Sequence, residues 1–366
     1  MIKIHKIAII GLGLMGGSLA LGLKNKGYEG IISGYDISTD NINKALRSKA
    51  IDTGATDAKE AVRDADLVVL GCPIGEYEKV FMEISGQLKP KSIVTDLGSV
   101  KSGPVALAKK IFPKDISFVG GHPMTGSEKG GFSAADPFLY ENAYYFITHE
   151  EDSSEDAIRV VEDMVGSLGA FCLRISPGEH DMIVSRISHL PHVIAMSLVN
   201  FLGQNDNSSY LPFVGGGFKD TTRIASGSPH MWKEILMSNR IEIIDSLVSF
   251  QELIGSIIGH LQKGEAKDIE GYLKDAKKIR DSMPYGKPDY IRPLYEIAVS
   301  IEDKPGAIAE LANIMMKQNI NIKEIEILHS RQSEGGAVRL AFDSREEQKL
   351  AVKTLGQEGF SKLYFS

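Results

Sequence analysis

Hydrophobic residues in the first half of the chain fall into short continuous runs, separated by stretches with helical spacing. The apolar runs are at 6–11, 31–36, 67–72, 92–98, 116–121 and 143–149. Continuous runs of this kind are typical of strands that are buried on both faces, and their alternation with helices indicates βαβ units. Segments 18–26 and 39–49 have the spacing of such helices. The pattern therefore predicts a mostly parallel α/β sheet.

From about residue 178 the apolar spacing becomes helical and few strand signals remain. Two long helical segments, 179–203 and 228–264, flank a glycine-rich connector, and a charged helix follows at 264–283. This helical region has more apolar surface than one short bundle can bury, so we expect two copies to interlock through it as a homodimer.

Three prolines in the ten residues 284–293 predict a linker. Beyond it the pattern of the chain changes again, to strand, helix, two strands, helix and strand, which predicts a small ferredoxin-like βαββαβ module. We expect three domains, at 1–175 (dinucleotide-binding), 176–285 (helical, for substrate binding and dimerisation) and 293–366 (regulatory).

The motif GLGLMG after the first strand indicates a dinucleotide site of the Rossmann type. Gly11 permits a tight turn, Gly13 lets the backbone approach a pyrophosphate, and Gly16 lets helix and strand pack closely. Asp36 ends the second strand, where a carboxylate accepts hydrogen bonds from ribose hydroxyls and repels a 2′-phosphate. We therefore expect NAD rather than NADP. The alternative is a tight βα turn without a ligand.

Composition narrows the function further. A net charge of -7 argues against nucleic acid as the main partner, and Cys72 and Cys172 provide neither a disulfide framework nor metal spacing. The apolar N-terminus lacks a cleavage site and leads directly into the glycine motif, so we interpret it as a strand. No continuous apolar run suggests a membrane span, and the cytoplasm is the expected location.

His122 stands in the stretch GGHPMTGSEKG, just after a strand-like run. Glycine and proline favour a loop, which we expect at the carboxyl edge of the sheet beside the cofactor. A neutral imidazole there accepts the hydroxyl proton during hydride transfer. Ser99 is placed to hydrogen-bond the same hydroxyl or the imidazole; the alternative for Ser99, compatible with that role, is a helix N-cap.

At this point the chain resembles the prephenate dehydrogenases of tyrosine biosynthesis. The motifs GLGLMGGSLA, DLGSVK, GGHPMTGSEKGG, SHLPH and GGGFKDTTRIASGSPHMW occur in the order of that family and cover about residues 5 to 285. One departure is Thr125, where the family usually has alanine. The resemblance implies NAD-dependent oxidative decarboxylation of prephenate to 4-hydroxyphenylpyruvate, with release of carbon dioxide.

The resemblance also implies roles for single residues. His122 matches the base, Ser99 matches its hydrogen-bonding companion, Arg223 matches the residue that binds a substrate carboxylate, and His192 matches a histidine that recognises the substrate side chain. A guanidinium suits a carboxylate because it forms bidentate, charge-assisted bonds. Surface pairing is the alternative for Arg223. His189 and His192 lack a third ligand, so we expect no metal.

The tail resembles an ACT domain, a module that binds small amino acids. Asp303 and the N–H groups around Gly306, in the turn DKPG, are the expected contacts for an amino-acid ligand. L-tyrosine, the end product of the pathway, is the expected effector. The alternative is a structural appendage that binds nothing.

Two other functions remain open at this stage. Arogenate dehydrogenase performs the same chemistry on the transaminated substrate, but His192 supplies no fixed negative charge for arogenate's ammonium. A non-catalytic NAD sensor is the other alternative, although sensing would need neither His122 nor Arg223.

Overall fold

The computed structural model describes residues 4–127, 129–204, 207–283, 295–302, 304–328, 336–360 and 363–365. Two compact units make up the chain, Met1–Tyr272 and Leu273–Ser366. The expected linker at 284–293 lies outside the described residues.

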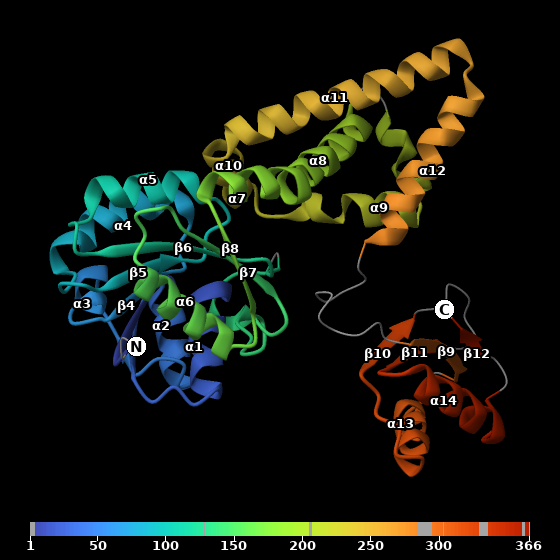
Figure 1. Ribbon diagram of the computed structural model, residues 1–366, viewed down its shortest axis with the longest axis horizontal. Helices are drawn as coiled ribbons and strands as arrows, with labels where there is room; N and C mark the ends of the chain where they lie inside the picture. The colour runs from blue at the N-terminus through green and yellow to red at the C-terminus, as the bar shows by residue number, and fades with distance from the viewer. Residues whose placement is uncertain are drawn as a thin grey trace. The chain divides into compact units, whose positions relative to one another are not determined.

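An eight-stranded sheet forms the centre of the first unit, in the order β3-β2-β1-β4-β5-β6-β7-β8 (Figure 1). The strands are β1 (Lys6–Ile10), β2 (Ile31–Tyr35), β3 (Thr53–Gly54), β4 (Leu67–Leu70), β5 (Ile93–Asp96), β6 (Ser117–Pro123), β7 (Tyr144–Thr148) and β8 (Phe171–Ile175). Strands β1 to β6 are parallel, in the order of dinucleotide-binding folds. The predicted Rossmann-type α/β fold is confirmed, although the sequence pattern missed β3 and β8.

Helices cover both faces of this sheet and bury two separate apolar clusters. The helices are α1 (Leu14–Asn25), α2 (Thr39–Arg47), α3 (Ala58–Val62), α4 (Tyr77–Ile84), α5 (Ser102–Ile111) and α6 (Glu155–Ser167). One cluster joins residues of α1 and α6, such as Leu19 and Val161, to the sheet. The other joins residues of α4 and α5, such as Phe81 and Ala108, to the opposite face.

His122 lies in strand β6 and not in a loop, which corrects the expectation from the sequence. The cause is β7, which runs antiparallel to β6 and pairs with its last residues, so that His122 is opposite Phe146. This pairing extends β6 beyond the parallel sheet despite its glycines and Pro123. The imidazole is nevertheless at the carboxyl edge, as expected.

The rest of the first unit is helical, as predicted. It comprises α7 (Pro177–Val184), the π-helical turn Ser185–His189, α8 (Leu190–Gly203), α9 (Gly216–Thr222), α10 (Pro229–Ser238), α11 (Arg240–Lys263) and the first part of α12 (Ala266–Ser282), with short 3₁₀ turns at Asn207–Phe213 and Arg223–Ser226. A helix turns about 100° per residue, so His180 and His189 would face opposite sides of an unbroken α-helix. The π turn inserts one residue into the helix and so shifts His189 by about 100° from that opposite position.

Apolar side chains remain exposed along α8 and α11. On α11 about half or more of each side chain is exposed at six apolar positions: Ile241, Ile244, Val248, Leu253, Ile258 and Leu261. The run Pro177–Gly203 is also long and apolar enough to cross a membrane, judged by length and composition only. Several of its buried polar side chains, however, bond to neighbouring side chains: His180 to His122, Ser185 to Ser246 and His189 to Asn239.

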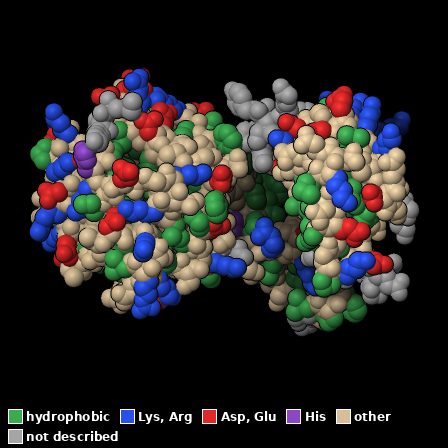
Figure 2. All heavy atoms as spheres, turned by 90° about the horizontal axis from the view of Figure 1, so that it is seen from below, with side chains coloured by type: hydrophobic (Ala, Val, Ile, Leu, Met, Phe, Trp, Pro, Cys, Tyr) green, Lys and Arg blue, Asp and Glu red, His purple; other side chains and the backbone are tan. Residues whose placement is uncertain are grey.

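The second unit contains a four-stranded antiparallel sheet in the order β10-β11-β9-β12. Its elements are β9 (Tyr295–Ile301), α13 (Ala307–Lys317), β10 (Glu324–Leu328), β11 (Gly336–Phe342), α14 (Arg345–Gln357) and β12 (Leu363–Phe365). The predicted succession of strands and helices is therefore present, with a core that includes Val299, Leu311 and Leu355. On the face drawn in Figure 2, basic and acidic side chains are interspersed.

The glycines of the first turn have distinct steric surroundings. Gly11 has φ +94° and packs on Gly71, while a Cβ on Gly16 would lie 2.0 Å from the carbonyl oxygen of Gly11. A Cβ on Gly13, by contrast, would meet nothing within 4 Å. The turn is thus tightly packed at Gly11 and Gly16 and open at Gly13.

We predict that Gly16→Ala destabilises the fold by about 1–3 kcal/mol, because the added methyl overpacks the turn. Gly13→Ala is the matched control: it should keep the wild-type melting temperature and weaken dinucleotide binding only. Thermal unfolding and a titration with NAD would separate the two effects. A wild-type melting temperature for Gly16→Ala would contradict the prediction.

Candidate active site

The glycine-rich turn and Asp36 form one side of the candidate site. The carboxylate of Asp36 accepts hydrogen bonds from the backbone N–H of Leu12 at 2.7 Å and of Ser38 at 2.8 Å. It therefore ties the end of β2 to the turn between β1 and α1. Helix α1 starts after Gly13 with no side-chain cap, so that its first N–H groups are available to an anion.

On the other side, a chain of hydrogen bonds leads away from His122. Nδ1 of His122 lies 2.8 Å from Nε2 of His180, and Nδ1 of His180 lies 2.8 Å from a carboxylate oxygen of Asp181. His180 and Asp181 are buried neighbours on α7, and Phe146 packs its ring edge-to-face with His180 at 5.4 Å between centroids. Neither residue was a candidate from the sequence; they stand out there as a polar pair in an apolar helical segment, but nothing in the sequence indicates their contact with His122.

Asp181 also caps helix α5. Its two carboxylate oxygens accept the backbone N–H groups of Lys101 at 2.7 Å and Ser102 at 2.8 Å. The cap position of α5 is Lys101, which makes no side-chain cap bond, so the alternative interpretation of Ser99 as the N-cap is wrong. A carboxylate from a distant helix takes this role, which leaves the half-buried Ser99 uncommitted to capping.

A second buried carboxylate, Asp96, organises the ends of β5 and β6. It accepts hydrogen bonds from the Tyr77 hydroxyl at 2.9 Å and from the N–H groups of Gly98 and Gly121 at 3.0 Å each. It also forms an ion pair with Lys101, and both side chains are fully buried. Burial lowers the pKa of Lys101, while Asp96 opposes that shift. The pair therefore fixes the strand just before His122.

Two further histidines line the same region. Nδ1 of His189 accepts from the Asn239 side-chain amide at 3.1 Å, and the same amide lies 2.9 Å from the carbonyl oxygen of Asp181. His192 stacks on Trp232 with 3.4 Å between ring centroids and 9° between planes. Its Nδ1 is buried without a hydrogen-bond partner among the described residues. A buried polar atom without a partner suits a ligand contact.

Burial keeps this histidine cluster neutral. Desolvation lowers the pKa of His122 well below its usual value, with further contributions from His180, Lys101 and His189. Burial also lowers the pKa of His180, of His192 and, to about 4, of His189. Burial alone would raise the pKa of Asp181, but bonds from His180 and the α5 amides outweigh it and the pKa falls. At neutral pH a carboxylate thus faces uncharged imidazoles.

The structure does not bring Arg223 into a recorded contact with this cluster. Arg223 is exposed, at the start of a 3₁₀ turn that packs against α8, the helix of His192. No ion pair joins it to Asp220 within the described ranges. The tail residue Asp303 lies outside the described residues; Gly306 is described and has φ +91° at the start of α13.

Helix α10 contacts the rim of the dinucleotide side. The carboxylate of Glu234 accepts the N–H of Gly75 at 3.2 Å, and a Cβ on Gly75 would lie 2.7 Å from that carboxylate. Gly75 belongs to the 3₁₀ turn Ile74–Glu76 that follows β4. Because α10 also carries Trp232, this hydrogen bond links the two sides of the site.

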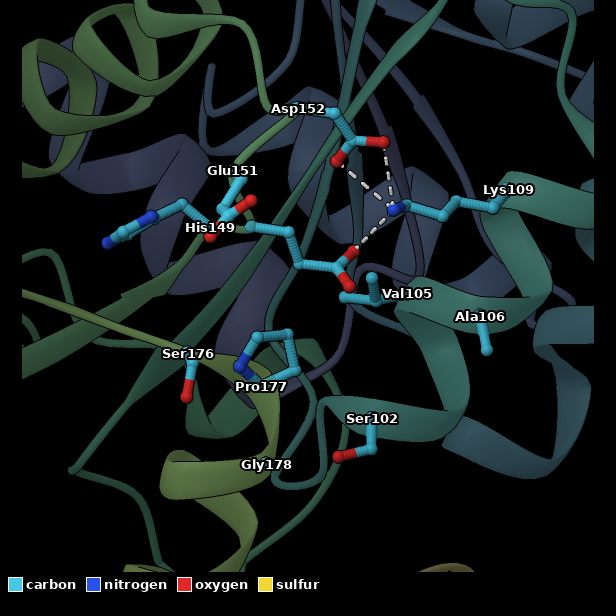
Figure 3. A pocket seen from close by; sticks show the side chains of 11 residues that line it. Ser102, Val105, Ala106, Lys109, His149, Glu151, Asp152, Ser176, Pro177 and Gly178 are labelled. Atoms are coloured by element: carbon cyan, nitrogen blue, oxygen red, sulfur yellow. Dashed lines mark hydrogen bonds and ion pairs between the residues drawn. The ribbon is translucent and has the colours of Figure 1, made fainter.

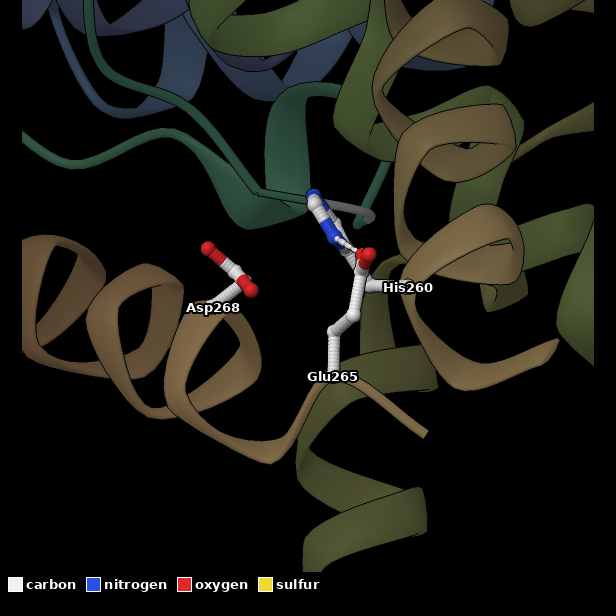
Figure 4. A group of neighbouring side chains, drawn as sticks. All are labelled: His260, Glu265 and Asp268. Carbon is white, nitrogen blue, oxygen red and sulfur yellow. Dashed lines mark hydrogen bonds and ion pairs between the residues drawn. The ribbon is translucent and has the colours of Figure 1, made fainter. Parts of the chain in front are cut away.

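Two other polar groupings have different explanations. A surface hollow beside α5 contains Lys109, which is already paired with Glu150 at 2.9 Å and Asp152 at 3.0 Å, so it offers no free cation (Figure 3). Between α11 and α12, His260, Glu265 and Asp268 place ligand-type atoms within 4.8 Å of one another (Figure 4). A 2.7 Å bond from His260 to Glu265 accounts for that pairing without an ion.

Comparisons with known proteins agree with this geometry. The family model "prephenate dehydrogenase, nucleotide-binding domain" matches residues 19–173, and the model "prephenate dehydrogenase, dimerization domain" matches residues 176–275. Prephenate dehydrogenase from Bacillus subtilis is 35% identical over 352 residues, 95% of each chain. Cyclohexadienyl dehydrogenase from Zymomonas mobilis is 30% identical over 291 residues, 78% of this chain and 98% of that protein.

Among solved structures, prephenate dehydrogenase from Aquifex aeolicus in complex with hydroxyphenyl propionate and NAD⁺ has a TM-score of 0.73 and 31% identity. The match covers 77% of this chain and 99% of that one. The fold and the site, with these relatives, define an NAD-dependent oxidoreductase. The chain belongs to the prephenate dehydrogenase family.

We predict that His189 makes stability depend on pH. Its pKa of about 4 in the folded state lies below the usual 6.5, so the unfolded state binds a proton first as pH falls. The free energy of unfolding should therefore fall by up to about 3 kcal/mol as the pH falls from 6.5 to 4. Above pH 6.5 His189 should not make the stability depend on pH. His189→Asn retains an acceptor for Asn239 but cannot titrate.

Urea unfolding at pH 7, 5.5 and 4.5 would measure the effect. The free energy of unfolding should fall less steeply for His189→Asn than for wild type. Parallel curves for the two proteins would show that His189 is not held neutral.

Proposed function

We propose that this chain catalyses NAD-dependent oxidative decarboxylation of prephenate to 4-hydroxyphenylpyruvate. The observation that carries the proposal is the position of His122, at the carboxyl edge of the sheet, with Nδ1 bonded to His180 and no recorded partner for Nε2 among the described residues. Family membership supplies the substrate class. The Aquifex aeolicus relative, in complex with NAD⁺ and hydroxyphenyl propionate, supports this cofactor and an aromatic ligand.

The residues present fit NAD. The open space at Gly13 leaves room for a pyrophosphate beside the first N–H groups of α1. Each oxygen of Asp36 accepts one backbone bond and retains lone pairs for ribose hydroxyls. A carboxylate at this position disfavours the 2′-phosphate of NADP. When bound, NAD accepts the hydride from C4 of the substrate.

The residues of the chain then handle the proton and orient the substrate. His122 is neutral and accepts the proton of the C4 hydroxyl through Nε2, while Ser99 hydrogen-bonds the same hydroxyl. Arg223, which has no recorded partner among the described residues, binds a substrate carboxylate. His192, held flat against Trp232, presents its unpaired Nδ1 to the substrate side chain. Loss of the ring carboxylate makes the ring aromatic, so the reaction proceeds downhill.

A homodimer is the proposed assembly. The match to a domain described as a dimerisation domain covers the helices α8 and α11, whose apolar side chains remain exposed in one copy. The exposed apolar side chains run from Ile241 to Leu261, over most of the length of α11. Burial of this apolar surface would supply the driving force.

The tail is proposed to be an ACT domain that binds L-tyrosine. The support is the βαββαβ succession and Gly306, whose positive φ at the start of α13 leaves N–H groups without a side-chain cap. The Bacillus subtilis relative is covered over 95% of its length by 95% of this chain, whereas the Zymomonas mobilis relative is covered over 98% by only 78%. The Zymomonas mobilis relative thus matches only about four fifths of this chain, although nearly all of its own length is covered.

Absorbance at 340 nm tests the activity directly, with prephenate or arogenate as substrate and NAD or NADP as cofactor. We expect NADH formation from prephenate with NAD. His122→Asn should bind NAD with wild-type affinity and lose about 10²–10⁴-fold in kcat, the usual contribution of a general base. A preference for arogenate would identify the alternative substrate, and near-normal kcat in the variant would exclude His122 as the base.

We also predict that tyrosine inhibits and that the tail contributes to this inhibition. A ligand on the tail affects the active site only if it binds one conformation of the enzyme better than another. Truncation after about residue 285 should leave an active enzyme with weaker inhibition. Tyrosine also resembles the product, so inhibition must be compared at several prephenate concentrations. Coincident curves for the full and truncated chains would exclude the tail as the tyrosine sensor.

A further inference from the structure

We propose that Asp181, acting through His180, fixes the tautomer of His122 in which Nε2 is the unprotonated acceptor. His180 is then a positioning residue for the base. The inference deepens the proposed function, because it rests on His122 as the group that accepts the substrate's hydroxyl proton.

The ionised carboxylate of Asp181 can only accept hydrogen bonds. Nδ1 of His180, 2.8 Å from Asp181, must therefore carry a hydrogen. A neutral imidazole has one N–H, so Nε2 of His180 is an acceptor. The 2.8 Å contact from His180 to Nδ1 of His122 then requires that Nδ1 be the donor. The lone pair of a neutral His122 is consequently on Nε2, the nitrogen available to the substrate.

The starting point of this chain is well defined. Asp181 cannot rotate freely, because its oxygens hold the N–H groups of Lys101 and Ser102. The ring of His180 is completely buried and packs against Phe146. The donors are therefore assigned from fixed partners in one direction, from the start of α5 through Asp181 and His180 to His122 in β6.

The same chain stabilises the proton once His122 has taken it. The substrate O–H bond breaks and an Nε2–H bond forms, which makes His122 a cation. Lys101, which disfavours this cation, is itself paired with Asp96, and His180 and His189 are neutral. Asp181 is the anion to which the hydrogen bonds lead. The N–H groups of His122 and His180 both point towards it, so their dipoles and its charge favour the cation.

A purely structural role for His180 is the competing explanation, since Asp181 already caps α5. Two substitutions separate the explanations. His180→Phe preserves a ring for Phe146 but removes both nitrogens. His180→Gln retains an amide oxygen that can accept from Nδ1 of His122, without the ability to relay the charge of Asp181. Ser246→Ala is the matched packing control, because it breaks only the 2.8 Å Ser185–Ser246 bond between the π turn and α11.

Kinetics with prephenate and NAD provide the first test. We expect kcat to fall about 10²-fold or more in His180→Phe. The decrease in His180→Gln should be roughly tenfold smaller, and the KM values of both variants should stay within about twofold of wild type. The acid limb of the kcat/KM profile should move to lower pH in His180→Phe, because Nδ1 of His122 loses the hydrogen-bond acceptor that stabilises its charged form. Ser246→Ala should match wild type.

Wild-type kcat in His180→Phe would overturn the proposal. So would equal losses in both variants with lower NAD affinity and an unmoved acid limb, because those results describe a packing defect. The second test needs no substrate. Nitrogen-15 NMR of histidine-labelled, full-length protein should show His122 protonated at Nδ1 and bare at Nε2 near pH 7, and this preference should be lost in His180→Phe.

Observation of the Nε2–H tautomer in wild type would overturn the proposal whatever the enzyme's substrate is. Conversely, the expected tautomer in a protein that fails to oxidise prephenate would refute the proposed function alone. The two tests therefore fail independently.

Discussion

The carboxylate of Asp181 holds the site together. It satisfies the free N–H groups at the start of α5, an interaction typically worth about 1 kcal/mol for a helix cap, and it thereby fixes α7 against the dinucleotide-binding sheet. Because His180 is the next residue along α7, this constraint also fixes the imidazole that contacts His122. One side chain thus joins the packing of two structural layers to the geometry of the base.

Asp96 complements this arrangement from within the sheet. A buried ion pair costs desolvation energy that its own attraction often fails to offset. Here the Tyr77 hydroxyl and two backbone N–H groups add hydrogen bonds to the pair with Lys101. The result is rigidity at one place, since Gly121 immediately precedes His122. Asp96 therefore fixes the backbone position next to His122, while Asp181, through His180, fixes the orientation of the His122 ring.

Local patterns predicted the parts of the fold that depend on local physics. Buried parallel strands appear as apolar runs, and the glycine motif reports the steric demands at Gly11 and Gly16. The two-residue strand β3 is too short to make a pattern, and β8 is half exposed, so its composition is mixed. The strand position of His122 depends on pairing with β7, a long-range contact that no local glycine or proline signal reveals.

The histidine chain was beyond sequence reasoning for a related reason. His180 lies 58 residues from His122, and its role arises only when α7 packs against the end of β6. The direction in which His189 points depends on the π turn, which shifts it by one residue's rotation relative to a continuous α-helix. The sequence SHLPH shows the histidines but not that turn, since no composition rule distinguishes it from a continuous α-helix.

The negative charge that serves the base and the positive charge that binds the substrate lie in different parts of the site. Lys101 is neutralised by Asp96, and Asp181 remains as a net negative charge among neutral imidazoles. That charge favours a proton on His122 but repels a substrate with two carboxylates. Substrate attraction must therefore come from outside the buried cluster, where Arg223 is exposed and unpaired among the described residues. Separating the anion that serves the base from the cation that binds the substrate prevents the two from neutralising each other.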